Sequence, residues 1–306
     1  MRSMQVVMVD RQFGLIRFLR GENNGRYPFA HSLYIKGKNC RVIIDPACSK
    51  EKLTKLRDNE GVDTVWLSHW HEDHFSFLYL FDKCPLWVSE KDFPPLTGLD
   101  QLLDAYGIAD KNHRAYWKAA FQKQFHFQPR NSARFINDGE IIDLGGITVE
   151  AIATPGHTPG HLSFFFREEG VLLLADYDLT SFGPWYGDAD SSIDETIASL
   201  RRLKKIPARV WLTCHDKGLF EENPGIIWEN YENTIYKREN KILAFLEKKP
   251  ATLDEITAAW LIYGRPREPL AFFQFGERAL LKKHLERLQR QGIVALDKEV
   301  YIKIKS

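Results

Sequence analysis

Potential metal ligands crowd the segment from residue 68 to residue 74, which reads Ser-His-Trp-His-Glu-Asp-His. His69, His71, Asp73 and His74 fall within six residues, directly after the apolar run at 64–67. Imidazole and carboxylate ligands together suit zinc, iron or manganese, and so many of them this close indicate parts of two coordination spheres. A polar loop at a strand end is the alternative, but it does not explain why residues with a high cost of burial gather here.

Three more residues of ligand type follow other apolar runs. His157 stands in the segment Thr-Pro-Gly-His-Thr-Pro-Gly-His at 154–161, whose prolines and glycines predict a rigid turn. Asp176 follows the run at 171–175, and His215 ends the run that begins at Val210. All of these ligands lie at the ends of predicted strands, which is where open α/β sheets place their ligands.

Composition limits the size and class of the protein. With 306 residues, of which 44% are hydrophobic, the chain can bury one large core and a small appended domain. The 42 basic and 41 acidic residues leave a formal charge of +1, which excludes a global field toward nucleic acid or anionic membrane. The chain shows no signal-peptide or spanning pattern and no C-x-x-C pair, so we expect a cytoplasmic protein that does not bind membranes.

The spacing of apolar residues predicts the helices and strands that position these ligands. A helix at 50–59 lies among short strands, and a second helix at 194–204 is opened by a capping box of Ser192 and Glu195. The pattern predicts an α/β fold. The strands are expected at 5–9, 15–19, 32–36, 41–45, 64–67, 86–89, 140–144, 147–153, 162–167, 171–175 and 210–215.

Residues 91–137 form an insertion with helical periodicity near 99–106 and 114–125. Its aromatic side chains either shape a substrate pocket near the ligands or bury their faces on the core, and the sequence favours neither. These side chains are Phe93, Tyr106, Tyr116, Trp117, Phe121, Phe125 and Phe127.

Long helices dominate after residue 222. Helices are predicted at 226–247, at 253–261 after a capping box of Thr252 and Glu255, and at 277–291, before strands at 293–296 and 300–304. Helices followed by a strand pair suggest a winged helix. We therefore expect one domain at 1–222 and a second at 223–306 that contains a linking helix and a winged-helix-like unit.

The order of these motifs resembles the metallo-β-lactamase superfamily. The likeness runs through H-W-H-E-D-H, T-P-G-H-T-P-G-H, L-L-A-D and L-T-C-H, and spans 41–217. The tail from residue 223 resembles the winged-helix extension of the lactamase-beta-2-like branch. This resemblance implies an αββα sandwich with a C-terminal helical, winged-helix domain and the activity of a metal-dependent hydrolase.

The resemblance also implies a dinuclear metal site, with zinc as the expected ion and iron or manganese as alternatives. Such a site can hold a bridging hydroxide as the nucleophile, so no catalytic serine or cysteine is required. Asp73 and Asp176 are the expected catalytic carboxylates. The implied ligands are His69, His71 and His157 for one ion, Asp73, His74 and His215 for the other, and Asp176 as the bridge.

Other residues near the motifs are assigned supporting roles. The resemblance matches Asp45 to an aspartate that orients a ligand histidine. The chain departs from the family at Ala175, where members often have glycine, and at Thr213-Cys214, where they often have Pro-Gly. We expect Cys214 to be a buried thiol rather than a ligand.

The roles of several histidines and aromatic residues stay open. His161 either hydrogen-bonds near the site or serves only the turn. An oxyanion donor could come from the aromatic residues after Asp176, although these could simply pack under the loop. Those candidates are Tyr177, Trp185 and Tyr186, whereas His31, His113, His126 and His284 fit no ligand pattern.

Three functions fit the sequence. The first is a dinuclear hydrolase acting on a small ester, thioester or lactone. The second is a phosphodiesterase or endoribonuclease whose winged helix holds nucleic acid through Lys283, Arg287 and Arg290, although Glu277 and Glu286 interrupt this stripe on the helix at 277–291. The third is a non-catalytic regulator that binds nucleic acid or a partner, which the intact ligand set disfavours. A small-molecule substrate is preferred, and a homodimer is left open.

Overall fold

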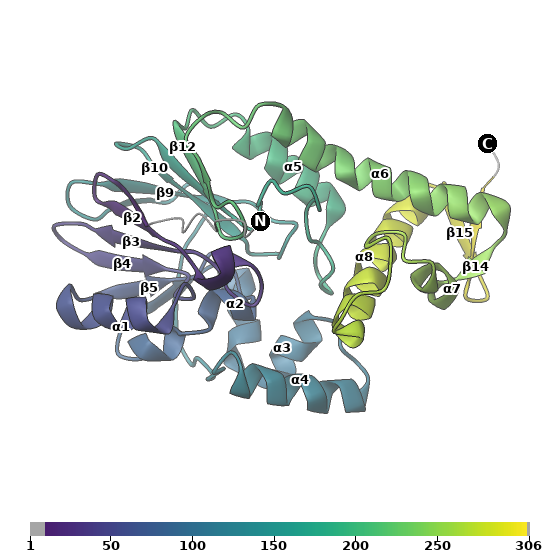
Figure 1. Cartoon of the computed structure of the whole chain (residues 1–306), viewed down its shortest axis with the longest axis horizontal. Helices are drawn as coiled ribbons and strands as arrows, with labels where there is room; N and C mark the ends of the chain where they lie inside the picture. The colour runs from purple at the N-terminus through teal and green to yellow at the C-terminus, as the bar shows by residue number, and fades with distance from the viewer. Residues whose placement is uncertain (1–9, 305–306) are drawn as a thin grey trace, which may run out of the picture.

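The computed structural model describes residues 10–304. Two sheets pack face to face, with helices on both outer faces, and a smaller helical unit projects to one side (Figure 1). The predicted strand at 5–9 lies outside the described residues. The α/β sandwich predicted from the motifs is therefore the observed architecture.

The first sheet has seven strands in the order β1-β2-β3-β4-β5-β6-β7. Strands β1 to β4 are joined as antiparallel neighbours, whereas β4, β5, β6 and β7 run parallel. The bounds are β1 Arg11–Phe13, β2 Ile16–Leu19, β3 Ser32–Lys36, β4 Arg41–Ile44, β5 Thr64–Trp66, β6 Leu86–Val88 and β7 Arg134–Phe135.

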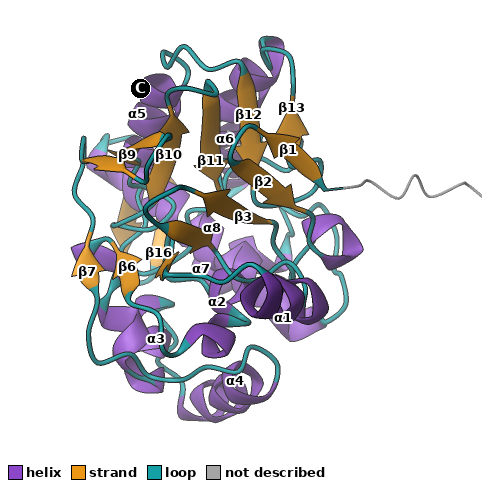
Figure 2. Ribbon diagram, turned by 90° about the vertical axis from the view of Figure 1, so that its left-hand side faces the viewer, coloured by secondary structure: helices purple, strands orange, loops and turns teal. Residues whose placement is uncertain are grey.

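The second sheet has six strands in the order β13-β12-β11-β10-β9-β8. Only β11 and β12 are parallel in it. Figure 2 shows this sheet beside strands of the first. Its strands are β8 Ile141–Asp143, β9 Thr148–Ala153, β10 Leu162–Phe166, β11 Val171–Ala175, β12 Val210–Thr213 and β13 Leu219–Phe220.

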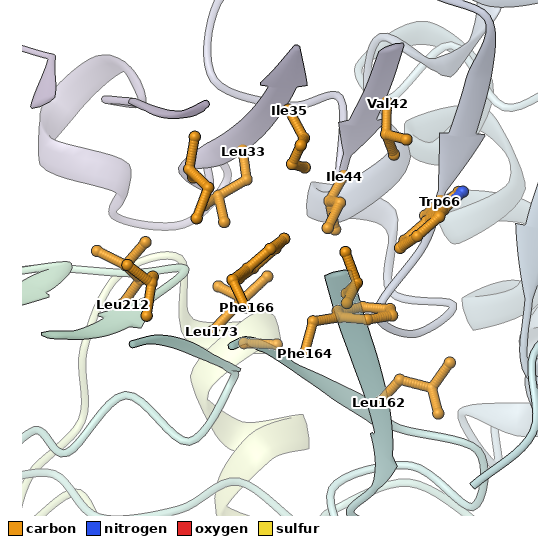
Figure 3. Close-up of a cluster of buried hydrophobic side chains, with 14 of the residues drawn as sticks. Leu33, Ile35, Val42, Ile44, Trp66, Leu162, Phe164, Phe166, Leu173 and Leu212 are labelled. Carbon is orange, nitrogen blue, oxygen red and sulfur yellow. The ribbon is translucent and has the colours of Figure 1, made fainter. Parts of the chain in front are cut away.

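Alternating side chains of the two sheets meet in one apolar layer (Figure 3). Leu162, Phe164 and Phe166 of β10 face Ile44 and Trp66 across this layer. Strand β11 is buried on both faces, because alternate residues point into this layer and toward the outer helices. Each large apolar side chain buried here contributes roughly 1.5–3 kcal/mol, so the sandwich is a rigid base for the loops at its edge.

Helices cover both outer faces of the sandwich. Leu53 and Leu56 of α1 pack on the first sheet, and Leu200 and Leu203 of α5 pack on the second. The helices of this part are α1 Lys50–Asn59, α2 Glu72–Phe75, α3 Leu99–Ala105, α4 Lys111–Lys123 and α5 Ile193–Leu203. Of the predicted capping box of α5, the Ser192 side chain accepts from Glu195 N–H.

The C-terminal unit contains three helices and a three-stranded sheet in the order β14-β16-β15. Thr252 and Glu255 form the predicted capping box. Its last helix begins seven residues before the predicted start at Glu277, because Pro269 precedes a continuous helical segment rich in phenylalanine. The elements are α6 Ile226–Lys248, β14 Ala251–Thr252, α7 Leu253–Ala258, α8 Leu270–Arg290, β15 Val294–Asp297 and β16 Val300–Lys303.

Candidate metal centre and its pocket

The predicted ligands come together at one edge of the sandwich. The loop after β5 and the short helix α2 carry 69–74, and the loops after β9, β11 and β12 carry His157, Asp176 and His215. Ala175 at the end of β11 has a φ of 51°, a region that glycine adopts without steric cost. Glycine would therefore suit the position before Asp176. Ala175 adopts the same backbone conformation at the cost of local strain.

Three imidazole nitrogens form the first group of potential ligand atoms. His69 Nε2 lies 3.0 Å from His71 Nδ1 and 3.2 Å from His157 Nε2, and His157 Nε2 lies 3.0 Å from His71 Nδ1. All three side chains are buried. Their nitrogens therefore point at a common centre, as three ligands of one ion would.

The second group contains His74, Asp73 and His215, with Asp176 between the groups. Asp176 Oδ1 lies 2.9 Å from His74 Nε2, while its Oδ2 lies 3.4 Å from both His157 Nε2 and His215 Nε2. Asp73 Oδ2 lies 3.5 Å from His215 Nε2. One carboxylate thus faces both groups, which is the position that a bridging ligand requires.

The outer nitrogens of these histidines are held by hydrogen bonds. Asp45 Oδ2 accepts from His74 Nδ1 at 3.0 Å, and Ser68 Oγ donates to the same carboxylate oxygen at 2.7 Å. Because the Ser68 hydroxyl hydrogen is used in that way, its oxygen accepts from His69 Nδ1 at 2.9 Å. Asp45 therefore makes the contact with a ligand histidine that the sequence predicted.

Three more outer contacts involve backbone carbonyls. The Trp185 carbonyl accepts from His157 Nδ1 at 3.1 Å, and His215 Nδ1 lies 2.5 Å from the Gly25 carbonyl and 3.1 Å from the Phe29 carbonyl. An imidazole whose outer nitrogen carries the proton presents a lone pair at the inner nitrogen. These contacts fix ligand-ready tautomers.

Asp188 was not predicted as a site residue from the sequence, although it contacts the predicted ligand His71 directly. Its Oδ2 accepts from His71 Nε2 at 2.8 Å, and its Oδ1 accepts from Trp185 Nε1 at 3.1 Å. The residue is buried, yet it lies 117 positions from His71. No local motif marks it, because the contact exists only after the loop before α5 folds over the centre.

Asp178 is a second carboxylate that the sequence did not single out. Its Oδ1 accepts from the His215 backbone N–H at 3.0 Å, and burial raises the pKa of Asp178 to about 8. It follows Asp176 by two positions, which is the only signal that the sequence holds. The side chain supports the loop that carries His215 and faces the pocket.

Burial and charge set the protonation of the predicted ligands. Burial lowers the pKa of His69 well below its usual value and lowers the pKa of His157 to about 4. Burial acts against ionisation of Asp176, but His74, His215 and His69 together hold its pKa well below the ordinary range. Burial acts against protonation of His71, His74 and His215, but Asp188 raises the pKa of His71 to about 9, and Asp176 raises the pKa of His74 and of His215 well above the usual value. A bound cation would replace these protons, because imidazole binds metal in its neutral form.

The donor set fits divalent cations. His74 Nε2 and Asp176 Oδ1 are buried and lie 2.9 Å apart, yet neither has a partner with hydrogen-bond geometry among the described residues. The neighbouring His69, His71 and His157 nitrogens lie close together with inward lone pairs, which would repel one another without a positive charge between them. Nitrogen and carboxylate oxygen are ligands that zinc, iron and manganese share.

The structure places His161 and Cys214, two residues near the predicted ligands. His161 is buried, its Nε2 accepts from the Asp176 backbone N–H at 3.3 Å, and its Nδ1 meets Thr154 Oγ1 at 2.8 Å. It therefore positions the backbone of Asp176. Cys214 is also buried, with its Sγ 3.6 Å from Asp45 Oδ2, on the outer side of His74.

None of the three aromatic candidates offers a free donor to an oxyanion. Tyr177 Oη donates to the Pro155 carbonyl, and Trp185 Nε1 donates to Asp188. Tyr186 Oη lies 2.8 Å from His284 Nε2, away from the pocket. These side chains pack around the loops, as the alternative interpretation predicted.

The other histidines stay outside the centre. His31 and His284 are buried, and His113 is exposed on α4. His126 Nδ1 lies 3.1 Å from the Ser76 carbonyl. Within the described residues, the groups of side chains that could hold a metal ion include none of these four.

A cavity of about 450 Å³ opens above the centre. His71, Asp73, Asp176 and His215 form part of its lining, and aromatic rings form much of the rest. The insertion supplies Tyr106, Trp117 and Phe121, and the C-terminal unit supplies Tyr263, Phe272, Phe273 and Phe275. The insertion thus shapes one wall of the pocket. The early turns of α8, before the predicted helix start at Glu277, form a second wall.

The predicted basic stripe on α8 faces the sandwich rather than solvent alone. Lys283 Nζ donates to the Ala189 carbonyl at 2.6 Å, Arg287 pairs with Asp194 and Glu239, and Arg290 pairs with Asp194. Glu277, which was expected to interrupt the stripe, is buried and accepts from the backbone N–H groups of Ile262 and Tyr263.

The sequence-family model described as the metallo-beta-lactamase superfamily matches residues 27–215 of the chain. This match covers most of the sandwich and every predicted ligand. The chain therefore belongs to the metallo-β-lactamase superfamily, as its motifs predicted, and the prediction of a hydrolytic enzyme is confirmed at this level.

Individual proteins are similar at low sequence identity. An atrochrysone carboxyl ACP thioesterase of Aspergillus fumigatus is 23% identical over 248 residues, which cover 76% of this chain and 65% of the thioesterase. A beta-lactamase-like protein 2 homolog of Caenorhabditis elegans is 25% identical, with 82% of this chain and 76% of that protein covered. The chain thus spans just under two thirds of the thioesterase.

Solved structures show the same fold. A metallo-beta-lactamase family protein from Thermus thermophilus matches with a TM-score of 0.72 at 22% identity, over 95% of this chain and 99% of that chain. The alignment therefore includes the C-terminal unit as well as the sandwich. Among the described residues, no helix is long and apolar enough to cross a membrane.

Proposed function

We propose that this protein is a dinuclear metal-dependent hydrolase that cleaves a thioester, ester or lactone of a small molecule. The observation that carries the proposal is the bottom of the pocket, where two groups of imidazoles share the carboxylate of Asp176. The similar thioesterase supports a thioester as the preferred substrate. Zinc is the proposed ion, with iron or manganese as alternatives.

In this proposal His69, His71 and His157 would hold one ion, Asp73, His74 and His215 would hold the other, and Asp176 would be shared between them. Two divalent ions held in this way would supply a water of lowered pKa and polarise the scissile carbonyl. Asp73 Oδ2 faces His215 at the pocket floor, where it can accept a hydrogen bond from an attacking water. A substrate that fills the space between the aromatic walls would displace water, which would strengthen the electrostatic interactions at the floor.

We also propose that residues 1–222 form the catalytic domain, with 91–137 as its helical insertion, and that 223–306 form a linking helix and a winged-helix domain. The order α6, β14, α7, α8, β15 and β16, with the strand pair at the end, supports this division. The contacts of Lys283, Arg287 and Arg290 with the sandwich favour a structural role for the winged helix over nucleic-acid binding.

Metal content and activity of one sample test the function. We expect two metal equivalents per chain and hydrolysis of thioesters, with both reduced in His157→Ala. His113→Ala is the matched control, because His113 is exposed on α4 and contacts no predicted ligand. A single bound iron with oxygen uptake would refute the hydrolase proposal, and two ions with turnover of phosphodiesters alone would favour the nuclease.

A further inference from the structure

The pocket walls come from four separate segments, and their aromatic rings contact one another around the cavity. On one side, Trp117 and Phe121 of α4 stack with a centroid distance of 5.7 Å, and Tyr106 stacks on Phe121 at 5.8 Å. On the other side, Phe272 of α8 stacks on Tyr27 at 5.0 Å. Such ring clusters are rigid because each side chain has only two rotatable bonds.

The two sides meet at the edge of the cavity. Trp117 lies 6.2 Å from Phe272 and 6.4 Å from Phe275, centroid to centroid. Phe273 contacts Tyr263 at 5.2 Å, and Tyr263 in turn stacks on Phe182 at 5.1 Å. The helical insertion of the sandwich and the C-terminal unit therefore form a single aromatic enclosure above the centre.

Three of these rings are only half-buried, whereas Phe121 is buried. Trp117, Phe272 and Phe273 keep part of their surface toward the cavity. The cavity volume of about 450 Å³ falls in the range of pockets that enclose a drug-sized ligand. A flat apolar group entering it would bury these ring faces, and ring-on-ring contact adds stabilisation that an alkyl chain does not provide.

We propose, resting on the function proposed above, that this enclosure binds the acyl group of the substrate as a flat aromatic ring system. Trp117 of α4 and Phe273 of α8 are its specificity-determining residues. The scissile carbonyl then lies toward Asp73 and Asp176 at the floor. The C-terminal unit contributes to substrate selection through the first turns of α8.

A panel of N-acetylcysteamine thioesters with acetyl, octanoyl or 2-naphthoyl groups tests this assignment on the full chain. We expect the wild type to prefer 2-naphthoyl over octanoyl by about tenfold in kcat/KM. Trp117→Leu and Phe273→Leu keep apolar bulk but remove a ring, so each lowers the naphthoyl-to-octanoyl ratio several-fold, as the energy of an aromatic pair implies. Phe135→Leu is the control, because Phe135 is exposed at 38% and lies outside the cavity.

Binding gives a second readout that does not depend on turnover. A non-hydrolysable 2-naphthyl ketone analogue should quench the fluorescence of Trp117 and Trp185 at the pocket and bind several-fold more weakly to Phe273→Leu. Equal kcat/KM for octanoyl and 2-naphthoyl, or an unchanged ratio in both variants, overturns the assignment. If no thioester is cleaved but the analogue binds as expected, the aromatic subsite stands and the thioesterase function fails.

Discussion

At the scale of single residues, the centre depends on contacts that hold each ligand in one tautomer. Metal-binding histidines commonly donate their second nitrogen to a carboxylate or carbonyl, and loss of that partner lowers metal affinity by about 10–100-fold. Here Asp45, Asp188 and three backbone carbonyls make such contacts with the outer nitrogens of the predicted ligands. We therefore expect Asp188 to affect metal binding through His71.

Replacement of Asp188 by asparagine tests this role. Asp188→Asn removes the carboxylate that accepts from His71 Nε2 at 2.8 Å, so we expect metal affinity to fall by about 10–100-fold. Competition with a chelator measures the change. Asp190→Asn, two positions further along and exposed, should bind metal as the wild type does. Equal affinity in both variants would show that Asp188 does not orient the ligand.

His284 makes stability depend on pH outside the metal centre. Burial lowers the pKa of His284 to about 4, against an ordinary pKa near 6.5. Between these values the unfolded chain binds more protons, so stability falls as pH drops from about 6.5 to 4, by up to about 3 kcal/mol. His284→Gln should show a shallower loss in urea unfolding across this window.

The matched control is the exposed His113→Gln, which should follow the wild-type pH profile. Glutamine retains an acceptor for Tyr186 Oη, which lies 2.8 Å from His284 Nε2. Parallel profiles for the wild type and His284→Gln would assign the acid loss to other buried groups.

At the scale of elements, α8 links the C-terminal unit to the pocket. Glu277 on this helix accepts from the backbone N–H groups of Ile262 and Tyr263, both at 2.9 Å, and so fixes the loop that carries Tyr263. Gly276 beside it leaves room for that ring, because a Cβ at this position would lie 2.8 Å from Tyr263 Oη. The loop and helix therefore act as one unit.

Glu277→Ala leaves two backbone donors without an acceptor. We expect a loss of roughly 1–3 kcal/mol per orphaned donor in the free energy of unfolding, measured in urea, together with weaker binding of the naphthyl analogue. Glu286→Ala, on the same helix with a side chain exposed at 37%, should change stability little. Unchanged stability in Glu277→Ala would mean that water replaces the lost acceptor.

At the scale of the whole molecule, ion pairs fasten the C-terminal unit to the sandwich. Arg287, with a side chain exposed at 12%, pairs with Asp194 at the start of α5 at 2.6 Å, and Arg290 pairs with the same carboxylate at 3.2 Å. The pair of Arg287 with Glu239 on α6, also at 2.6 Å, lies within the C-terminal unit. Pairs of this kind restrain the two units, and the pocket between them needs that restraint because both contribute walls.

Arg287→Ala should destabilise the protein by about 3–5 kcal/mol, because the buried Glu239 then keeps only its contact with His284 Nδ1 at 3.5 Å. Arg290→Ala, which removes a side chain exposed at 60%, should cost less than about 1 kcal/mol.

Fluorescence anisotropy with single-stranded RNA tests whether the basic stripe binds nucleic acid. Salt-dependent binding that Arg290→Ala weakens would instead show that the stripe binds nucleic acid.

The sequence determined most elements and predicted the candidate ligands that the fold brings together, because both depend on local patterns. The predicted helix at 50–59 matches α1, and the strands before His69 and Asp176 match β5 and β11 closely. Apolar runs that end in histidine or aspartate identify strand ends, and a helix period of 3.6 residues identifies amphipathic faces. Seven residues could be assigned to one site because their motifs lie close to such ends.

Tertiary structure alone decided which distant groups support the site. Asp188 reaches His71 across 117 positions, and the first turns of α8 reach the pocket from the far end of the chain. The start of α8 was predicted too late, since the phenylalanines at 272, 273 and 275 and the glycine at 276 do not form an amphipathic pattern with a period of 3.6 residues. Contacts between segments distant in sequence leave no periodic signal, so only the folded chain shows that two units enclose one pocket.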